Sequence, residues 1–191
     1  FCPEINEMYE KGLNYKQYNF NSIDSKLEGK YRKDHFNGVA TIVSKLFELF
    51  KPNQAFFGEK DFQQTQIVKR LIDLEKHKTK LIICPTVREK NGLAMSSRNN
   101  LLSQKNRENS SIIFHNLNYV KTHFKKTDFD EIISKCIKSI NSCDGFKTEY
   151  FEIVDSFSLS KQKKYSTDKS YRVFVSVIVE EVRLIDNILL N

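Results

Sequence analysis

The sequence contains no tryptophan, three prolines, six glycines and only four cysteines among its 191 residues. The cysteines (Cys2, Cys84, Cys136 and Cys143) form no CxxC pair. Cys136 and Cys143 are too far apart for a zinc knuckle and lack nearby histidines, so we predict neither a disulfide framework nor a metal site. Reduced and mostly packed thiols are typical of a cytoplasmic protein, which is the location we expect.

Long hydrophobic runs are also missing, and none approaches the length of a membrane-spanning helix. Residues 1–4 show neither the basic region nor the hydrophobic segment of a signal peptide. We therefore expect no membrane partner. The sequence has no initial methionine and opens as if already inside a fold, so we expect it to be a fragment of a longer protein.

The charged residues show an excess of one sign, with a formal net charge of +7. This sign suits either nucleic acid or small molecules that carry phosphate. The basic run at 161–164 is typical of a solvated loop, and the aromatic residues mostly fall on apolar faces of expected helices and strands. We therefore favour phosphate-bearing small molecules and predict no nucleic-acid partner.

Hydrophobic periodicity indicates an α/β chain with two parts. It predicts helices at 22–28, 37–50, 61–77, 103–123 and 128–141, and strands at 15–20, 55–57, 81–84, 148–154, 171–179 and 181–189. The alternation of helix and strand up to residue 84 is typical of a parallel sheet, whereas the last three strands predict a small antiparallel sheet. We place the domain boundary between 1–86 and 87–191.

The octet at 57–64, which reads FGEKDFQQ, follows an expected strand and opens an expected helix. Ligands of open α/β sheets bind at such turns, at the carboxyl ends of strands. Gly58 would allow close approach of a ligand to the backbone, and Lys60 offers a compact positive charge to a phosphate. Asp61 could cap the helix or accept a ribose hydroxyl. A solvated turn with a helix cap would explain these residues equally well.

A second polar cluster, at 92–99, reads GLAMSSRN and lies in the expected loop at 85–100. Arg98 can bind phosphate oxygens in bidentate fashion, and the hydroxyls of Ser96 and Ser97 can donate to the remaining oxygens. The alternative is a polar linker in which Ser97 or Asn99 caps a turn.

Taken together, the two clusters resemble two motifs of the pantoate–β-alanine ligase family. Residues 27–39, with Arg32 and His35, resemble the segment that precedes the family's long helix, and 183–187 (RLIDN) resemble its final strand. The resemblance covers residues 1–189 in order. It implies the C-terminal part of a Rossmann-like nucleotidyltransferase domain that binds ATP and pantoate (1–86), followed by a C-terminal α+β lid domain (87–191).

The resemblance also implies the reaction and the residues that take part in it. Pantoate and ATP, with Mg²⁺, would give pantoyl adenylate and pyrophosphate, and β-alanine would then displace AMP to give pantothenate, a coenzyme A precursor. Lys60, Ser96, Ser97 and Arg98 would be catalytic. The ATP-binding set would be Gly58, Glu59, Lys60, Asp61, Val87, Met95, Ser96, Ser97 and Arg98. Gln64, Arg32 and His35 would bind substrate, and the full-length protein would be a homodimer.

Two departures from the family pattern are visible. The N-terminal histidine motif of the family is missing, so we expect these 191 residues alone not to catalyse adenylation at a useful rate. Lys33 and Asp34 stand where the family usually has Pro-Gly. Two other functions remain open: another adenylate-forming nucleotidyltransferase, or a non-enzymatic basic domain that binds RNA in a salt-sensitive way.

Overall fold

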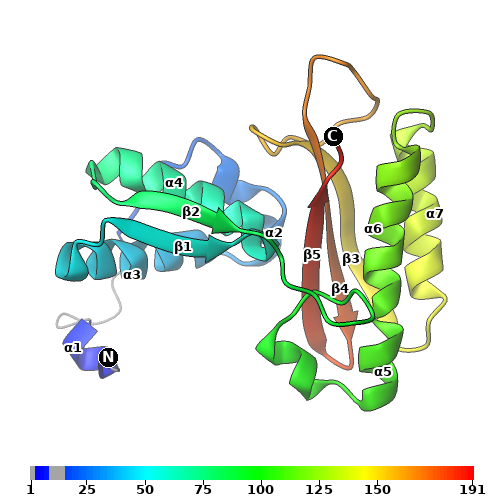
Figure 1. Ribbon diagram of the computed structural model, residues 1–191, viewed down its shortest axis with the longest axis horizontal. Coiled ribbons are helices and arrows are strands. Elements are labelled where there is room, and N and C mark those ends of the chain that lie inside the picture. Colours follow the sequence, from blue (N-terminus) through cyan, green and yellow to red (C-terminus); the bar gives the residue numbers. More distant parts are fainter. Residues whose placement is uncertain (1–2, 9–15) are drawn as a thin grey trace. The chain divides into compact units, whose positions relative to one another are not determined.

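The computed structural model describes residues 3–8 and 16–191, apart from the side chains of residues 5 and 6 (Figure 1). The chain forms two compact units, Phe1–Cys84 (unit 1) and Pro85–Asn191 (unit 2).

Unit 1 is a parallel α/β unit. Its elements are α1 (Ile5–Met8), the 3₁₀ helix η1 (Ile23–Ser25), α2 (Glu28–Tyr31), α3 (His35–Phe50), β1 (Gln54–Gly58), the 3₁₀ helix η2 (Glu59–Asp61), α4 (Phe62–Glu75) and β2 (Lys80–Cys84). Strands β1 and β2 pair in parallel, with Gln54 opposite Lys80 and Gly58 opposite Cys84. The predicted parallel arrangement and the predicted helices at 37–50 and 61–77 are confirmed.

The core of unit 1 lies between the two long helices and one face of the sheet. It contains Phe20, Phe36, Ala40, Val43, Phe47, Ile67, Val68 and Leu71. On α3 and α4 these residues recur every three or four positions, so burial of one apolar stripe explains why both segments are helical. The turn between β1 and α4 thereby lies at the carboxyl end of a strand.

The strand predicted at 15–20 is wrong for residues 16–20, which form no regular element; Tyr15 lies outside the described residues. The backbone amide of Lys16 donates to Thr41 Oγ1 at 3.1 Å, and that of Tyr18 donates to Asn37 Oδ1 at 3.1 Å. Side chains of α3 therefore satisfy amides that a neighbouring strand would otherwise bind. The helix predicted at 22–28 is instead η1 followed by α2, and Ser22 makes no capping hydrogen bond.

Unit 2 places α-helices against an antiparallel sheet. Its elements are the 3₁₀ helix η3 (Ser97–Leu101), α5 (Gln104–Asn109), α6 (Ser111–His123), α7 (Phe129–Asn141), β3 (Phe146–Asp155), β4 (Tyr171–Val179) and β5 (Val182–Leu189). The three strands form the predicted antiparallel sheet, in the order β3-β4-β5, and α6 and α7 cover one face of it (Figure 1). The core between them includes Val120, Phe129, Ile132, Ile153 and Val175.

The helix predicted at 103–123 is two helices, because the chain bends at Ser110. The Ser110 hydroxyl donates to the carbonyl oxygen of Asn106 at 2.6 Å, and a serine bonded back in this way often bends a helix. α5 begins where predicted, since Ser103 Oγ accepts from the amide of Asn106.

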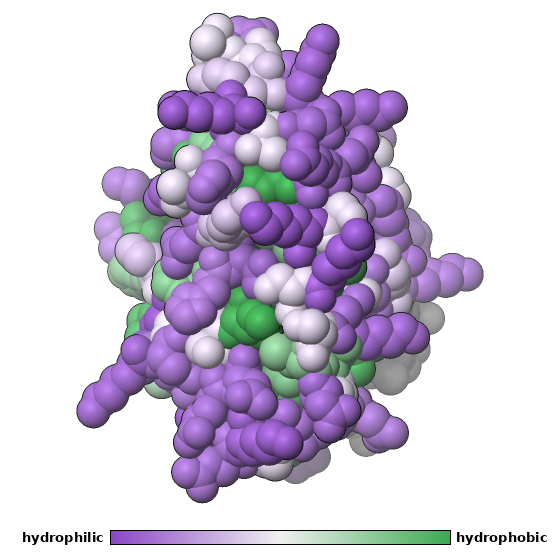
Figure 2. Space-filling model, turned by 90° about the vertical axis from the view of Figure 1, so that its right-hand side faces the viewer, coloured by the Kyte–Doolittle hydropathy of each residue, from purple (hydrophilic) through white to green (hydrophobic). Residues whose placement is uncertain are grey.

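The surface is largely hydrophilic on the face shown in Figure 2, with hydrophobic atoms in small separate patches. On α7, for example, Glu131, Lys135 and Lys138 are exposed while Ile132 and Cys136 are buried. No helix among the described residues is long and apolar enough to cross a membrane.

Candidate active site

The turn between β1 and α4 carries the first predicted cluster. A Cβ atom added to Gly58 would meet no atom within 4 Å, so the backbone here faces open space. Lys60 Nζ lies 3.8 Å from Asp61 Oδ1, and the Lys60 side chain is only 19% exposed. Asp61 occupies the N-cap position of α4 without making a side-chain capping bond, so its carboxylate is not used by the helix. The turn thus presents opposite charges beside accessible backbone.

The two glutamines that follow have different surroundings, although they are neighbours in the first turn of α4. Gln64 is half-buried, whereas Gln63 is buried. Gln63 Nε2 donates to the carbonyl oxygens of Ile23 at 2.7 Å and Lys26 at 2.8 Å, and its Oε1 accepts from the amide of Glu28 at 3.1 Å. Gln63 therefore anchors the segment that leads into α2.

Arg32 follows α2 and His35 is the first residue of α3, and the two side chains contact each other, with Arg32 Nη1 2.9 Å from His35 Nε2. Asp34, between them, has φ 58°. This left-handed conformation favours glycine and is one that aspartate tolerates better than most residues. The turn where the family usually has Pro-Gly is therefore built here with aspartate.

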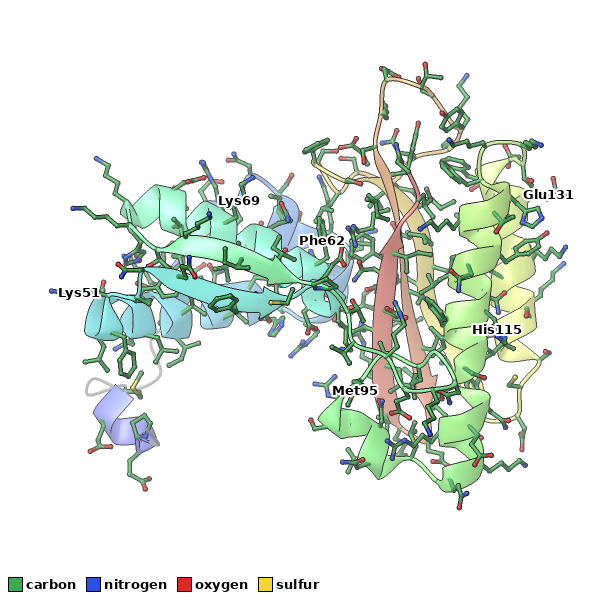
Figure 3. All side chains as sticks on the ribbon, viewed as in Figure 1. Lys51, Phe62, Lys69, Met95, His115 and Glu131 are labelled. Atoms are coloured by element: carbon green, nitrogen blue, oxygen red, sulfur yellow. The ribbon has the colours of Figure 1, made fainter. Side chains whose placement is uncertain are left out.

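The second cluster, at 92–99, lies in unit 2. It begins on a hairpin formed by residues 87–95 and continues into η3 (Figure 3, Met95). The amide of Glu89 donates to the Leu93 carbonyl at 2.8 Å, and the amide of Met95 donates to the Val87 carbonyl at 2.9 Å. Gly92 closes the turn with φ 92°, a conformation that side chains rarely adopt. Val87 and Met95 are exposed, at 66% and 55%.

Ser96, Ser97 and Arg98 follow the hairpin directly. Ser96 Oγ accepts from the Arg98 amide at 3.2 Å, so Ser96, rather than Ser97 or Asn99, caps η3. Ser97 and Arg98 are exposed. The Arg98 guanidinium donates to the carbonyl oxygen of Arg183 at 3.3 Å, a long contact that a phosphate could replace.

An ion pair joins this hairpin to β5. Arg88 Nη1 and Nη2 donate to the two carboxylate oxygens of Asp186 at 2.6 and 3.1 Å. The Arg88 guanidinium also lies 3.9 Å from the centre of the Phe114 ring on α6. Asp186 is 4% exposed, and bidentate pairing satisfies its buried charge.

Further support comes from Glu89, Asn99 and Arg107. Asn99 Nδ2 donates to Glu89 Oε1 at 2.7 Å, and Arg107 Nε donates to Glu89 Oε2 at 3.0 Å. The hydrogen bond from Arg107 holds the pKa of Glu89 below its usual value. Burial opposes this shift, and the hydrogen bond from Asn99 adds a smaller lowering of the pKa. The carboxylate is thereby kept as an acceptor.

The structure therefore places the predicted residues in three groups: the Arg32–His35 pair, the β1–α4 turn of unit 1, and the hairpin of unit 2 with its continuation. The β1–α4 turn carries Gly58, Glu59, Lys60, Asp61 and Gln64, and the hairpin with its continuation carries Val87, Met95, Ser96, Ser97 and Arg98. Sequence reasoning did not assign functional roles to the residues that hold these segments, namely Gln63, Arg88, Glu89, Asn99, Arg107 and Asp186. Their polar character was visible, but their partners were not. Within the described part of the chain, no group of three or more His, Cys, Asp or Glu side chains could hold a metal ion.

Comparison with known sequences gives a consistent set of relatives. The family described as pantoate-beta-alanine ligase matches residues 1–189. A pantothenate synthetase from Flavobacterium psychrophilum is 40% identical over 191 residues, which are 100% of this chain and 68% of the relative. Another, from Azobacteroides pseudotrichonymphae, is 42% identical over 188 residues, or 98% of this chain and 67% of the relative. The chain thus spans about two thirds of these relatives.

Solved structures agree with the sequence relatives. The pantothenate synthetase of Thermus thermophilus superposes with a TM-score of 0.88 at 32% identity, covering 98% of this chain and 68% of the other. A pantoate-beta-alanine ligase from Francisella tularensis, complexed with beta-gamma ATP and beta-alanine, gives a TM-score of 0.72 at 32% identity, covering 96% and 61%.

Proposed function

The chain belongs to the pantoate–β-alanine ligase family, an ATP-dependent ligase family, and we propose that the full-length protein acts through a pantoyl-adenylate intermediate. In the first step a pantoate carboxylate oxygen attacks the α-phosphorus of ATP, and the bond to the bridging oxygen breaks to release pyrophosphate. In the second step the amine of β-alanine attacks the acyl carbon, loses a proton and displaces AMP.

Two observations carry this proposal: at the first motif the Lys60 cation lies beside the open backbone of Gly58, and at the second the Arg98 cation follows the hydroxyls of Ser96 and Ser97. Lys60 and Arg98 neutralise charge that develops on the phosphates, and Ser96 and Ser97 donate to phosphate oxygens. Because no covalent enzyme intermediate is needed, these residues act by positioning and charge stabilisation. The 3.3 Å bond from Arg98 to the Arg183 carbonyl is weak enough to exchange for a phosphate.

The remaining predicted residues bind the rest of the nucleotide. Gly58 and Asp61 hold the ribose side; the Asp61 carboxylate, which makes no capping bond, and the open space at Gly58 support this. Glu59, between them, belongs to the same ATP-binding set. Val87 contacts adenine through its backbone, beside the exposed Met95. The Val87 carbonyl already accepts from Met95, but a carbonyl oxygen has a second lone pair.

Three residues of unit 1 are proposed to bind substrate. Gln64 holds pantoate. It lies in the first turn of α4 and is only half-buried, whereas its neighbour Gln63 is buried. Arg32 and His35 are proposed to lie in the substrate pocket. The 2.9 Å contact with His35 would fix the position of the Arg32 guanidinium.

Mg²⁺ is proposed to arrive with ATP. Magnesium is commonly held by substrate phosphates and waters together with only one or two carboxylates, so the phosphates of ATP and waters would supply most of its ligands. When bound, the ion would withdraw charge from the phosphates. The chain's own contribution remains the cationic and hydroxyl groups named above.

Three further proposals concern the whole protein. Unit 2 acts as a lid, because it carries Arg98; small-angle scattering with and without ATP and pantoate tests this. The family resemblance supports a homodimer for the full-length protein, which sedimentation measures. The free thiols of Cys84, Cys136 and Cys143 support a cytoplasmic location, which fractionation of the source cells tests.

The chemistry is tested with the full-length product of the gene that encodes this chain. Pantoate alone should support exchange of pyrophosphate with ATP, and AMP should accumulate only when β-alanine is added. Lys60→Ala should lower exchange by ~100- to 1,000-fold, the usual loss when one donor to a developing charge is removed. Lys69→Ala, an exposed lysine on α4 (Figure 3), is the matched control. Exchange that is unchanged in Lys60→Ala would refute the proposed role.

A further inference from the structure

The segment Ser96–Arg98 needs support from the rest of unit 2, because Ser97 and Arg98 are exposed to solvent at the start of a short 3₁₀ helix. Groups that stabilise a transition state must be held close to their productive positions before substrate binds. The backbone bonds of the hairpin end at Met95. Beyond it, Ser96 Oγ accepts from the Arg98 amide within η3, and the Arg98 guanidinium makes a long contact with the Arg183 carbonyl. The position of this segment relative to the hairpin therefore depends on further support.

Asn99 provides such support. Asn99 is the residue directly after Arg98, and it is only 1% exposed. Nδ2 donates to Glu89 Oε1 at 2.7 Å and to the carbonyl oxygen of Ala94 at 3.0 Å. One amide group therefore links Asn99 to both sides of the hairpin, to Glu89 on one and Ala94 on the other. Ser96–Arg98 lies between Ala94 and Asn99, which the second of these hydrogen bonds holds together.

Glu89 is itself held from a third element. Arg107 on α5 donates to its carboxylate from Nε at 3.0 Å and from Nη2 at 3.0 Å. This fork fixes the carboxylate in position as well as in charge. Hairpin, η3 and α5 are thus joined through one carboxylate and one amide.

The amide of Asn99 is only partly satisfied, because its donors are used and its acceptor is not. Asn99 Oδ1 is buried and has no hydrogen-bond partner within the described part of the chain. An unsatisfied buried acceptor is costly, and an apolar residue of similar size would avoid that cost. What the amide adds is geometric: two donors directed at two specified oxygens.

We propose that Asn99, held through Glu89 and Arg107, is a positioning residue that fixes Ser96–Arg98 for transfer of the adenylyl group to pantoate. The inference rests on the proposed function of that segment. Asn99 touches no reacting group itself. Its loss should therefore lower kcat for adenylation more than it raises the KM for ATP, since the contacts of Ser96–Arg98 strengthen as charge develops.

The test compares Asn99→Ala with Asn116→Ala in the full-length protein. Asn116 is also buried in unit 2, and its Nδ2 likewise donates to a carbonyl oxygen, of Ile112 at 2.9 Å, and to a side-chain oxygen, of Ser139 at 3.2 Å. Both variants should lose similar stability in urea. Only Asn99→Ala should lower the kcat of pantoate-dependent pyrophosphate exchange, by about 10- to 100-fold.

A rescue experiment separates positioning from general damage. Asn99→Asp removes both donors and places a second carboxylate against Glu89, so exchange should fall at least as far as in Asn99→Ala. Adding Glu89→Gln restores an amide–carboxylate hydrogen bond with donor and acceptor reversed, and part of the lost kcat should return. If Asn99→Ala does not fold, Arg107→Lys gives the same test, because lysine cannot supply the fork to Glu89.

The outcomes are distinct. If Asn99→Ala has the kcat of Asn116→Ala, or if the double variant is no better than Asn99→Asp, the positioning role is overturned. Arg98→Ala distinguishes failure of the positioning role of Asn99 from failure of the proposed function of Ser96–Arg98. If Arg98→Ala loses exchange while Asn99→Ala retains it, only this inference fails. If Arg98→Ala retains wild-type kcat, the proposed function of the segment fails and this inference fails with it.

Discussion

Glu75, at the C-terminal end of α4, should make unit 1 sensitive to acid. Its carboxylate accepts hydrogen bonds from Tyr18 Oη at 2.9 Å and from the Lys16 ammonium and the Ser44 hydroxyl, and His77 Nε2 lies 3.0 Å away. Burial would raise the pKa of Glu75, but these four partners outweigh it and lower the pKa from 4.5 to about 2.

The size of the effect follows from that pKa. Each pKa unit corresponds to ~1.4 kcal/mol, so ionised Glu75 contributes up to ~3 kcal/mol to the free energy of unfolding. Because the pKa is lower in the folded state than in the unfolded state, this contribution is fully present above about pH 5.5. It declines as the pH falls toward the folded-state pKa, and about 2 kcal/mol is lost by pH 3.

The perturbation is Glu75→Gln, which keeps the shape of the side chain and removes its charge. At pH 7 the variant should be ~3 kcal/mol less stable than wild type in urea unfolding, and the gap should narrow to ~1 kcal/mol at pH 3. Glu48→Gln, the same change at an exposed position of α3, is the control and should alter neither value. A gap of equal size at both pH values would refute the reasoning.

Two further outcomes are expected. Gly92→Ala should destabilise unit 2 by ~1–3 kcal/mol in thermal unfolding, because φ is 92° and the new Cβ would lie 2.5 Å from the Phe114 ring. Gly145→Ala, with φ 76° and no atom within 4 Å, meets only the backbone strain, so an equal loss in both variants would argue against the clash. Burial raises the pKa of the Cys136 thiol to about 12, so at pH 8 this cysteine should resist iodoacetamide until the protein is unfolded in urea. Rapid labelling of Cys136 in the native protein would contradict the packing of α7.

Periodic burial was readable from the sequence, and pairing between distant polar groups was not. The stripes of α3 and α4 predicted the helices because each stripe faces one core. The segment at 16–20 has an alternating pattern, but its amides are bound by Asn37 and Thr41, which no local pattern reveals. Tertiary hydrogen bonds therefore decided its conformation.

The same limit applies to the candidate site. Lys60 and Arg98 lie in contiguous motifs that can be recognised in the sequence, and their proposed roles follow from those motifs. Gln63 and Asp186 act through partners up to 40 and 98 positions away, so their contribution depends on the fold. The motif residues could be predicted, but the residues that hold them in place could not.

The pairing of Arg88 with Asp186 also sets an order of events during synthesis. Arg88 is added to the growing chain 98 residues before its partner Asp186 on β5. Contacts over such separations form late, because the intervening chain must first be ordered. The loop that carries Arg98 is therefore among the last parts of unit 2 to reach its final form, and nascent chains that stop before Asp186 lack the anchor of that loop.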